Sequence, residues 1–150
     1  MRIVIQRVSE ASVRIDNKLV GQIDAGMMIL LGIEEVDDQS DADWLVQKVL
    51  GLRIFSDEEG KMNRSIGEMN GRFLVVSQFT LHASTKKGNR PSYIRAARPE
   101  HAIPLYEYFI QQLGILSNTT IETGKFGADM KVSLLNDGPV TIHMDSKSRE

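Results

Sequence analysis

The strongest strand pattern in the sequence is Phe73-Leu74-Val75-Val76-Ser77-Gln78-Phe79-Thr80-Leu81. Apolar and β-branched residues in a run of this length are typical of a buried strand, and polar residues follow abruptly at its end. If the strand stays regular, Ser77 and Phe79 share one face and Gln78 and Thr80 share the other, because side chains alternate along a strand. A bulge would break that division.

Further strands are predicted on both sides of this segment. Residues 1–16 read as a strand interrupted around Ser9 to Ser12, as in an opening hairpin or a bulged strand, and Asn17-Lys18 reads as a turn. We also expect strands at residues 19–24, 27–33, 118–123, 131–135 and 140–144. The polar tail, residues 145–150, should fray.

Two helices are predicted. The first begins near Ser40, because Ser40 and Asp43 have the spacing of a capping box. It carries an apolar stripe that should pack on the sheet, formed by Trp44, Leu45, Val49 and Leu52. The second has Pro99 in its first turn and Gly114 as its stop. Between these helices, residues 56–72 are polar and punctuated by glycine, which predicts a hairpin tip and a surface loop.

The fold class follows from length and from the order of the elements. A chain of 150 residues with 41% hydrophobic and 25% charged residues is expected to form one domain over residues 1–150. Two helices against about eight short strands, without one-for-one alternation, favour a layered α+β fold over a doubly wound parallel sheet. The sequence therefore predicts a single α+β domain.

Composition excludes several function classes. The chain has no cysteine, so it has no disulfide, thiolate nucleophile or cysteine-ligated metal. No apolar stretch approaches the ~20 residues of a membrane span, and the amino terminus lacks a signal segment, so we expect a cytoplasmic protein that does not contact a membrane. A net charge of −2 means that only a local basic patch could bind RNA.

Cofactor and metal sites have no pattern in this sequence. No glycine-rich loop with nucleotide-binding spacing follows a strand, so we predict no cofactor. His82, His101 and His143 are scattered without metal-ligand spacing, so we predict no metal. Ser77 lacks the flanking glycines of a serine-hydrolase elbow.

Three segments could carry chemistry. At the end of the central strand, Ser77 to Thr80 are either ordinary polar residues of a strand end or a binding site for an acyl group. In the second case, their hydroxyl, amide and free backbone N–H groups would stabilise the oxyanion that forms at the acyl carbonyl. The second segment is a basic stretch without an acidic residue, which is either a solvated loop or a phosphodiester contact. Its cations are Lys86, Lys87, Arg90, Arg95 and Arg98. The third, Asn136 to Thr141, is either a tight turn or the site of a cis Gly138-Pro139 peptide.

Together these segments resemble the D-aminoacyl-tRNA deacylases. The resemblance rests on Ser77-Gln78-Phe79-Thr80-Leu81, on Lys87-Gly88-Asn89-Arg90-Pro91-Ser92 and on Thr123-Gly124-Lys125-Phe126-Gly127-Ala128 running into Asn136-Asp137-Gly138-Pro139-Val140-Thr141. It also covers the opening residues 1–13, and no signature segment departs from the pattern.

The resemblance implies a homodimer with a layered β/β/α fold and mainly antiparallel, barrel-like sheets. It implies hydrolysis of the ester between a D-amino acid, or mischarged glycine, and the terminal adenosine of tRNA. In the family Ser77, Gln78, Phe79 and Thr80 would line the pocket. A cis Gly138-Pro139 would reach into the partner's pocket and exclude L-amino acids by leaving no room for their side chains.

Two catalytic routes follow from that reading. Thr80 could be the nucleophile, but a threonine needs a base and the sequence offers only His82. Direct attack by water, assisted by the 2′-hydroxyl of the terminal ribose, needs no triad and is favoured here. Lys86, Lys87 and Arg90 are candidates for the acceptor-stem backbone. The alternatives are a non-catalytic dimeric RNA-binding module and a generic Ser/Thr esterase, the latter disfavoured because no base accompanies the hydroxyls.

Overall fold

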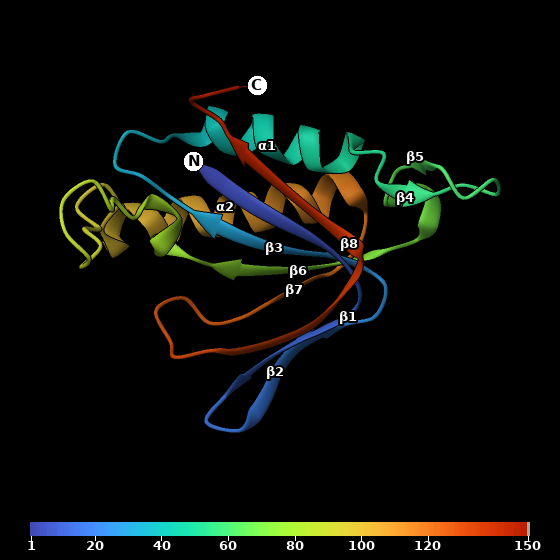
Figure 1. Cartoon of the computed structure of the whole chain (residues 1–150), viewed down its shortest axis with the longest axis horizontal. Helices are drawn as coiled ribbons and strands as arrows, with labels where there is room; N and C mark the ends of the chain where they lie inside the picture. The colour runs from blue at the N-terminus through green and yellow to red at the C-terminus, as the bar shows by residue number, and fades with distance from the viewer. Residues whose placement is uncertain (150) are drawn as a thin grey trace.

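The long strand β1 (Arg2–Ile15) organises the sheet in the computed structural model, which describes residues 1–149 (Figure 1). Its first half pairs antiparallel with β3 (Gly26–Gly32) and its second half with β2 (Lys18–Ile23). β8 (Lys131–Asp145) runs antiparallel along its other edge. The predicted irregularity is confirmed as bulges within one bent strand, so β1 contributes to two parts of the sheet.

The β1–β2 turn lies one residue earlier than predicted. It is formed at Asp16 and Asn17, whose φ angles are 49° and 63°. Asp and Asn tolerate this left-handed conformation better than most residues, and a tight hairpin turn requires it.

The rest of the sheet is parallel. β6 (Arg72–Ser77) lies between β3 and β7 (Ile121–Thr123) and runs parallel to both. The sheet then curls until β2 approaches β7: a Cβ atom at Gly21 would lie only 2.5 Å from the carbonyl oxygen of Thr123. The predicted barrel-like sheet is therefore confirmed as nearly closed, with two parallel pairs inside a mainly antiparallel arrangement.

Both faces of the central strands are buried, which produces the layers. Helices α1 (Gln39–Gly51) and α2 (Pro99–Ser117) cover one face (Figure 1). There Ile5, Ile29 and Phe73 are almost fully buried against helix residues such as Phe109. The other face encloses a second cluster within the curled sheet, formed by Val8, Ala11, Val13, Ile23, Met28, Leu74 and Val76. The order of layers is thus β/β/α, as expected.

The helix boundaries differ from the predicted ones at both helices. The capping box of α1 uses Asp38 and Asp41 rather than Ser40 and Asp43, because Asp38 accepts from the Ser40 N–H while Asp41 accepts from the Asp38 N–H. In α2, Pro99 lies in the first turn as predicted.

The second helix also runs past its predicted stop. α2 continues through Gly114 to Ser117 and ends where Asn118 adopts φ 52°. Asparagine is the residue after glycine that most often supplies this left-handed cap, so the stop signal of α2 is Asn118 and the prediction of Gly114 is wrong.

The polar segment after α1 forms the predicted hairpin and surface loop. The hairpin consists of β4 (Phe55–Ser56) and β5 (Met62–Arg64), followed by the short 3-10 helix η1 (Gly67–Met69). Ile66, in this loop, is buried in the main hydrophobic core and thereby anchors the loop to the rest of the domain.

The carboxyl-terminal strands differ most from expectation. Residues 131–135 and 140–144 belong to one strand, β8, because Asn136 and Thr141 both pair with β1 while residues 137–140 bulge out between them. The tail does not fray at Ser146 and Lys147: Ser146 is buried, and Lys147 Nζ lies 2.7 Å from Asp41 Oδ2. Arg149 covers the ring of Trp44 at 4.6 Å, while Glu150 lies outside the described residues.

Candidate functional site

The central strand ends four residues earlier than the sequence pattern predicts. β6 stops at Ser77, and Phe79–His82 form a 3-10 helix, η2. Gln78 marks the transition: its N–H donates to the Leu31 carbonyl at 2.8 Å, the last bond toward β3, and its φ and ψ are −145° and 82°. The predicted alternation of residues 77–81 is therefore wrong beyond Gln78, because the backbone coils.

This coil leaves two backbone donors free of the ladder. In η2 the N–H of Leu81 donates to the Gln78 carbonyl, at 3.3 Å, and that of Ala83 to the Thr80 carbonyl. Leu81 is the first residue of this coil whose N–H can reach a carbonyl three residues earlier. The N–H groups of Phe79 and Thr80 come before it and have no such acceptor within the turn. They are the kind of backbone donor that can stabilise an oxyanion.

A pocket of about 260 Å³ lies beside this coil, at the carboxyl ends of the parallel strands β3 and β6. This is the sheet edge at which ligands of parallel sheets bind. Its floor is apolar, and Ser77 and Gln78 supply polar groups. The lining residues are Leu31, Ile33, Val76, Ser77, Gln78, Phe79, Ala97, Ala102, Phe126, Gly127, Ala128, Met130 and Val132.

Thr80 lies next to the pocket rather than in its lining. Its hydroxyl oxygen accepts a hydrogen bond from the side-chain amide of Gln78. That bond uses a lone pair of the oxygen and leaves the hydroxyl proton available to donate. The geometry thus makes Thr80 a donor toward neighbouring oxygens rather than an activated nucleophile.

His82 is no base for Thr80. It is 1% exposed, and neither ring nitrogen has a hydrogen-bond partner within the described chain. Burial lowers the pKa of His82 below its ordinary value. The backbone of Gly32, and then Glu34, whose Oε2 lies 3.7 Å from Nδ1, oppose this only in part. His82 is therefore a neutral core residue beneath η2, and the hypothesis that it activates Thr80 has no geometric support.

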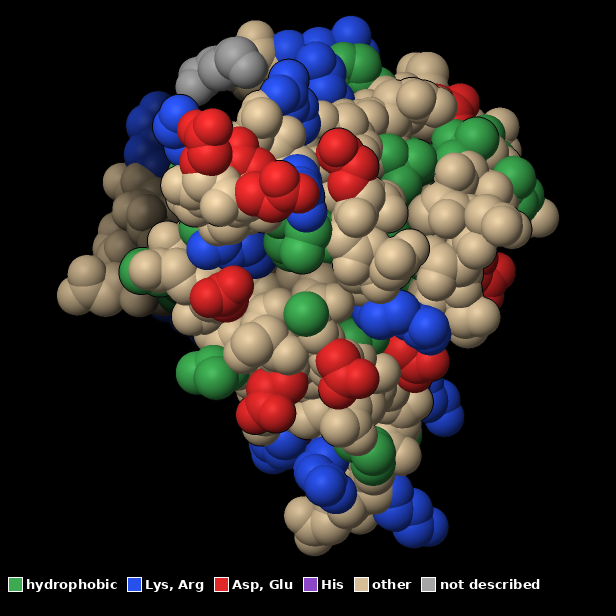
Figure 2. Space-filling view, turned by 90° about the vertical axis from the view of Figure 1, so that its right-hand side faces the viewer, with side chains coloured by type: hydrophobic (Ala, Val, Ile, Leu, Met, Phe, Trp, Pro, Cys, Tyr) green, Lys and Arg blue, Asp and Glu red, His purple; other side chains and the backbone are tan. Residues whose placement is uncertain are grey.

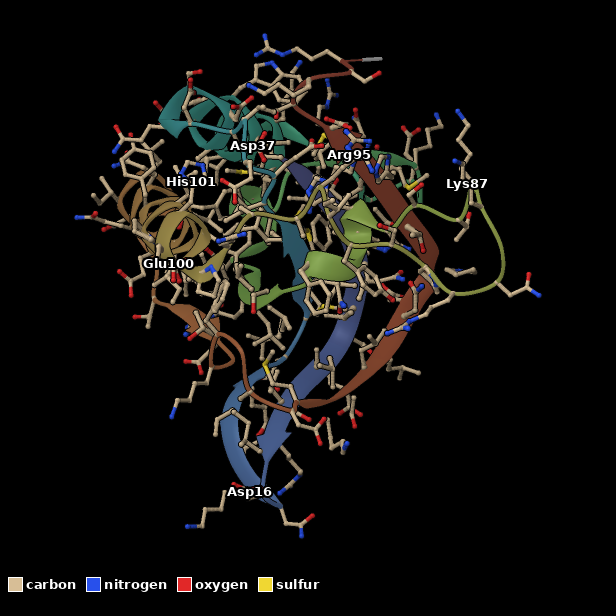
Figure 3. The ribbon with its side chains drawn as sticks, turned by 90° about the vertical axis from the view of Figure 1, so that its left-hand side faces the viewer. Asp16, Asp37, Lys87, Arg95, Glu100 and His101 are labelled. Atoms are coloured by element: carbon tan, nitrogen blue, oxygen red, sulfur yellow. The ribbon has the colours of Figure 1, made fainter. Side chains whose placement is uncertain are left out.

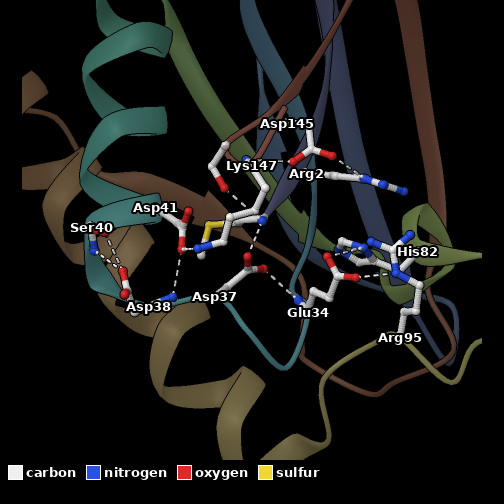
Figure 4. Close-up of polar contacts among 12 residues, drawn as sticks. Arg2, Glu34, Asp37, Asp38, Ser40, Asp41, His82, Arg95, Asp145 and Lys147 are labelled. Carbon is white, nitrogen blue, oxygen red and sulfur yellow. Dashed lines mark hydrogen bonds and ion pairs between the residues drawn. The ribbon is translucent and has the colours of Figure 1, made fainter. Parts of the chain in front are cut away.

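A network of charged groups holds the loop that follows η2 (Figure 4). Glu34, itself buried, accepts from Arg95 Nε. Asp37 accepts from the Glu34 N–H at 2.7 Å and pairs with the amino group of Met1. The Ala97 N–H donates to the Ile33 carbonyl at 2.9 Å. The carboxyl-terminal end of the loop, residues 83–97, is thereby fixed to the segment after β3.

Arg2 and Asp145 extend this network to η2. Arg2 Nη1 donates to the Leu81 carbonyl at 3.0 Å and its Nε to Asp145 at 2.7 Å. Burial alone would raise the pKa of Asp145, but the hydrogen bonds from Arg2 and the Lys147 N–H outweigh it and lower that pKa. Asp145 is thus the ionised partner that orients Arg2 against the coil.

The basic residues project from the tip of the same loop. Ser84 and Ser92 exchange backbone hydrogen bonds of 2.8 and 2.9 Å, which close the loop, and Gly88 has φ +67° at its tip. Lys86, Lys87 and Arg90 are outside every ion pair of residues 1–149, and Lys87 points outward from the tip (Figure 3). The structure brings them to the same end of the molecule as the pocket but does not place them in its lining.

Gly138 and Pro139 are exposed on β8, joined by a cis peptide bond, and do not line the pocket of their own chain. Arg7, only 8% exposed, donates from Nε to the Asp137 carbonyl at 2.8 Å and from Nη1 to the Ile54 carbonyl at 2.6 Å. Gln6 accepts from both Asn136 and Thr141. This clamp of Gln6 and Arg7 fixes the exposed segment from the neighbouring strand.

Sequence reasoning missed the aromatic wall of the pocket. Phe126 packs edge-on against Tyr106 with ring centroids 5.7 Å apart, and the Tyr106 hydroxyl donates to the Val75 carbonyl at 3.0 Å. Burial raises the pKa of Tyr106 to about 12, so it stays a donor at neutral pH. Gly124 allows Met130 to approach, since a Cβ atom there would lie 2.3 Å from its sulfur.

The opposite end of the molecule also has a pocket, of about 460 Å³, to whose lining Arg72 and Phe73 at the start of β6 contribute. Figure 2 shows basic and acidic side chains interspersed there, with hydrophobic ones in small groups. Within residues 1–149, no three His, Asp or Glu side chains are grouped as a metal site would need. No helix in the same range is long and apolar enough to cross a membrane.

The fold and the site together define an α+β protein with a nearly closed sheet and an acyl-sized pocket at the ends of its parallel strands. The family model for D-Tyr-tRNA(Tyr) deacylase matches residues 4–145, and the chain belongs to that family.

Individual relatives agree with this assignment. The D-aminoacyl-tRNA deacylase of Phocaeicola vulgatus is 64% identical over 150 residues, with both chains covered completely. A solved structure titled c-Myc DNA Unwinding Element Binding Protein is 41% identical, with TM-score 0.92 and coverage of 97% of this chain and 98% of that one. A probable eukaryotic D-amino acid tRNA deacylase, 17% identical with TM-score 0.82 over 95% and 97% of the chains, shares the fold.

Proposed function

We propose that residues 1–150 form one deacylase domain that hydrolyses the ester of D-aminoacyl-tRNA, and of tRNA mischarged with glycine, in the cytoplasm. The observation that carries the proposal is the junction of β6 and η2, where backbone N–H groups leave the ladder beside an acyl-sized pocket. Family membership supports the substrate class. Neither a cofactor nor a metal is needed for this reaction.

Water is the nucleophile in this proposal. Its oxygen attacks the ester carbonyl, the bond to the ribose 3′-oxygen breaks, and that oxygen takes a proton, which leaves a free amino acid and intact tRNA. The adjacent 2′-hydroxyl of the substrate assists the proton transfers. The N–H groups of Phe79 and Thr80 stabilise the oxyanion, while Ser77 and Gln78 line the acyl side. The burial of His82 in the core supports this route over a threonine nucleophile.

Selection for D-amino acids operates by exclusion between two subunits of a homodimer. Gly138 and Pro139 are exposed and outside the pocket of their own chain, which is the placement expected of a segment that enters the pocket of a partner. Their carbonyl groups would hold the α-ammonium group and leave no space where an L side chain projects. Glycine has no side chain to exclude, so it is hydrolysed too.

The basic loop provides the contact with the acceptor stem. Lys86, Lys87 and Arg90 are exposed, carry no ion pair in the described chain and lie at the pocket end of the molecule. Cations in this position neutralise phosphates while the pocket receives the 3′ end.

Turnover tests the proposal. Purified protein should release many equivalents of D-tyrosine from D-tyrosyl-tRNA. Tight binding of the tRNA without release would instead leave a non-catalytic dimeric RNA-binding module, and the site at Ser77 to Thr80 would have no catalytic role.

A further inference from the structure

Two large aromatic side chains lie exposed at the rim of the pocket. The Phe79 side chain is 56% exposed and that of Tyr93 38% exposed. Their rings meet edge to face, with centroids 5.0 Å apart and an angle of 76° between the planes. An edge-to-face pair holds each ring in place while leaving ring surface open. Exposed aromatic groupings of this kind mark interaction sites more often than isolated exposed residues do.

The pair connects the pocket to the basic loop. Phe79 is part of the pocket lining, whereas Tyr93 belongs to the loop and follows Ser92, the residue that closes it by its exchange of backbone hydrogen bonds with Ser84. The Tyr93 carbonyl accepts from the Ala96 N–H at 3.0 Å, in a turn that leads to the anchored Arg95. Tyr93 is therefore held from both sides and can form a fixed surface.

The positive charges in the loop that carries Tyr93 indicate a negatively charged partner for the Phe79–Tyr93 pair. Residues 83–98 contain two lysines and three arginines and no acidic residue, although the whole chain has a net charge of −2. Flat aromatic surface next to unpaired cations suits a partner that combines planar rings with negative charge. Single-stranded nucleic acid has this combination, and bases stack on aromatic side chains without needing a particular sequence.

The size of the pocket places this partner outside it. A volume of about 260 Å³ is at or below the lower limit of ordinary ligand pockets, so it receives only the reacting end of a longer molecule. The next nucleotide must lie at the rim, where Phe79 leads to Tyr93.

We propose that Tyr93 and Phe79 form a stacking platform for the unpaired nucleobase that precedes the terminal adenosine of the substrate. The inference rests on the proposed function for the identity of the reacting end. It adds a second recognition point, which reads the single-stranded character of the 3′ end rather than the amino acid.

Binding of two analogues with a stable amide in place of the ester tests the platform. One is 3′-(D-tyrosylamino)-adenosine, and the other carries the same group at the end of a cytidine-cytidine-adenosine trinucleotide. The unaltered protein should bind the trinucleotide more tightly. In Tyr93→Ala this advantage should shrink by about five- to 100-fold, the range that stacking of one base provides. Tyr93→Phe keeps the ring and should restore it.

Ile94→Ala is the matched control, because Ile94 is the neighbouring residue, 88% exposed and not aromatic. It should keep the full advantage of the trinucleotide. Equal weakening of both analogues by Tyr93→Ala would overturn the platform and make Tyr93 a support of the pocket. Loss of the oligomeric state in Tyr93→Ala would also overturn it, since the pair would then be a contact between two copies.

The same titrations separate this inference from the proposed function. If the unaltered protein prefers the trinucleotide through Tyr93 but releases nothing from D-tyrosyl-tRNA, the platform stands and the hydrolase fails. If it releases D-tyrosine but Tyr93→Ala retains the preference for the trinucleotide, the hydrolase stands and the platform fails.

Discussion

Thr80 is the residue on which the two catalytic routes differ. Its oxygen accepts from the Gln78 amide, and no described side chain is in position to remove its proton. We expect kcat of Thr80→Ala to fall by less than about tenfold, whereas loss of a general base or its target costs ~10²–10⁴-fold. Single-turnover rates on D-tyrosyl-tRNA measure this, with Thr85→Ala in the adjacent loop as the control. A loss beyond ~10³-fold with unchanged tRNA binding would contradict attack by water without a chemical role for Thr80.

His82 should make stability depend on pH. Its pKa in the folded protein lies below the ordinary value of 6.5, so the unfolded chain binds the extra proton and the free energy of unfolding falls as the pH drops below about 6.5. The slope for one proton approaches about 1.4 kcal/mol per pH unit. Asp145 and Asp41 also have lowered pKa values, but their stabilisation is lost only below their ordinary value of 3.8.

Urea titrations between pH 5 and about 7.5 measure this effect. His82→Phe should remove most of the slope, because a phenyl ring fits the apolar surroundings and binds no proton. His143→Gln, at an exposed position, should keep it. An unchanged slope in His82→Phe would assign the titration to another group.

For single residues, the sequence predicts where the pocket lies along the chain but not all the residues that line it. Ser77 and Gln78 could be predicted because polar residues end an apolar strand. Phe126 and Met130 could not, since apolar residues in a loop give no sign of the pocket they line. Arg7 could have been predicted from its position: it follows Ile3 and Ile5 at every second residue of one strand and therefore faces the same buried side. A buried charge needs a partner, which marks Arg7 as a residue with a specific contact.

Among the elements, the parallel pair β3 and β6 depends on close contact at its start. A Cβ atom at Gly26 would lie 1.9 Å from the Arg72 carbonyl oxygen and 2.6 Å from its nitrogen, both backbone atoms that cannot move aside alone. We therefore expect Gly26→Ala to lower the free energy of unfolding by at least about 1–3 kcal/mol. Gly51→Ala, in open space at the end of α1, should be neutral or slightly stabilising. Equal stability of the two variants in urea would contradict the packing described here.

Element types were easier to predict than element ends. Strands β1, β3 and β6 follow from their apolar content, and both helices from their stripes. The end of β6 could not be read, because Phe79 and Leu81 continue the apolar pattern while the backbone coils into η2. The continuity of β8 was hidden for the opposite reason: Asn136 to Pro139 have turn composition, yet they form a bulge within one strand, held by side-chain hydrogen bonds with Gln6 and Arg7.

Across the whole molecule, positive charge is concentrated in residues 83–98, which contain five cations and no acidic residue, although the net charge of the chain is −2. We expect Lys87→Glu to weaken tRNA binding several-fold at low salt and to reduce the slope of log K against log [salt] by about one. Lys61→Glu, on the hairpin at the far end and paired with Glu59, should change neither. Binding titrations from low to high salt measure both quantities, and identical slopes for the two variants would remove the loop from the interface.

The proposed mechanism combines ester hydrolysis with selection for D-amino acids by exclusion. Its most direct test is the initial rate of amino acid release from matched D-tyrosyl-tRNA, L-tyrosyl-tRNA and glycyl-tRNA by the purified protein. The proposed mechanism predicts fast release of D-tyrosine and glycine, with L-tyrosine released at least about 100-fold more slowly. Comparable rates for D- and L-tyrosine would contradict it, because a segment that fills the space of an L side chain cannot let both esters react.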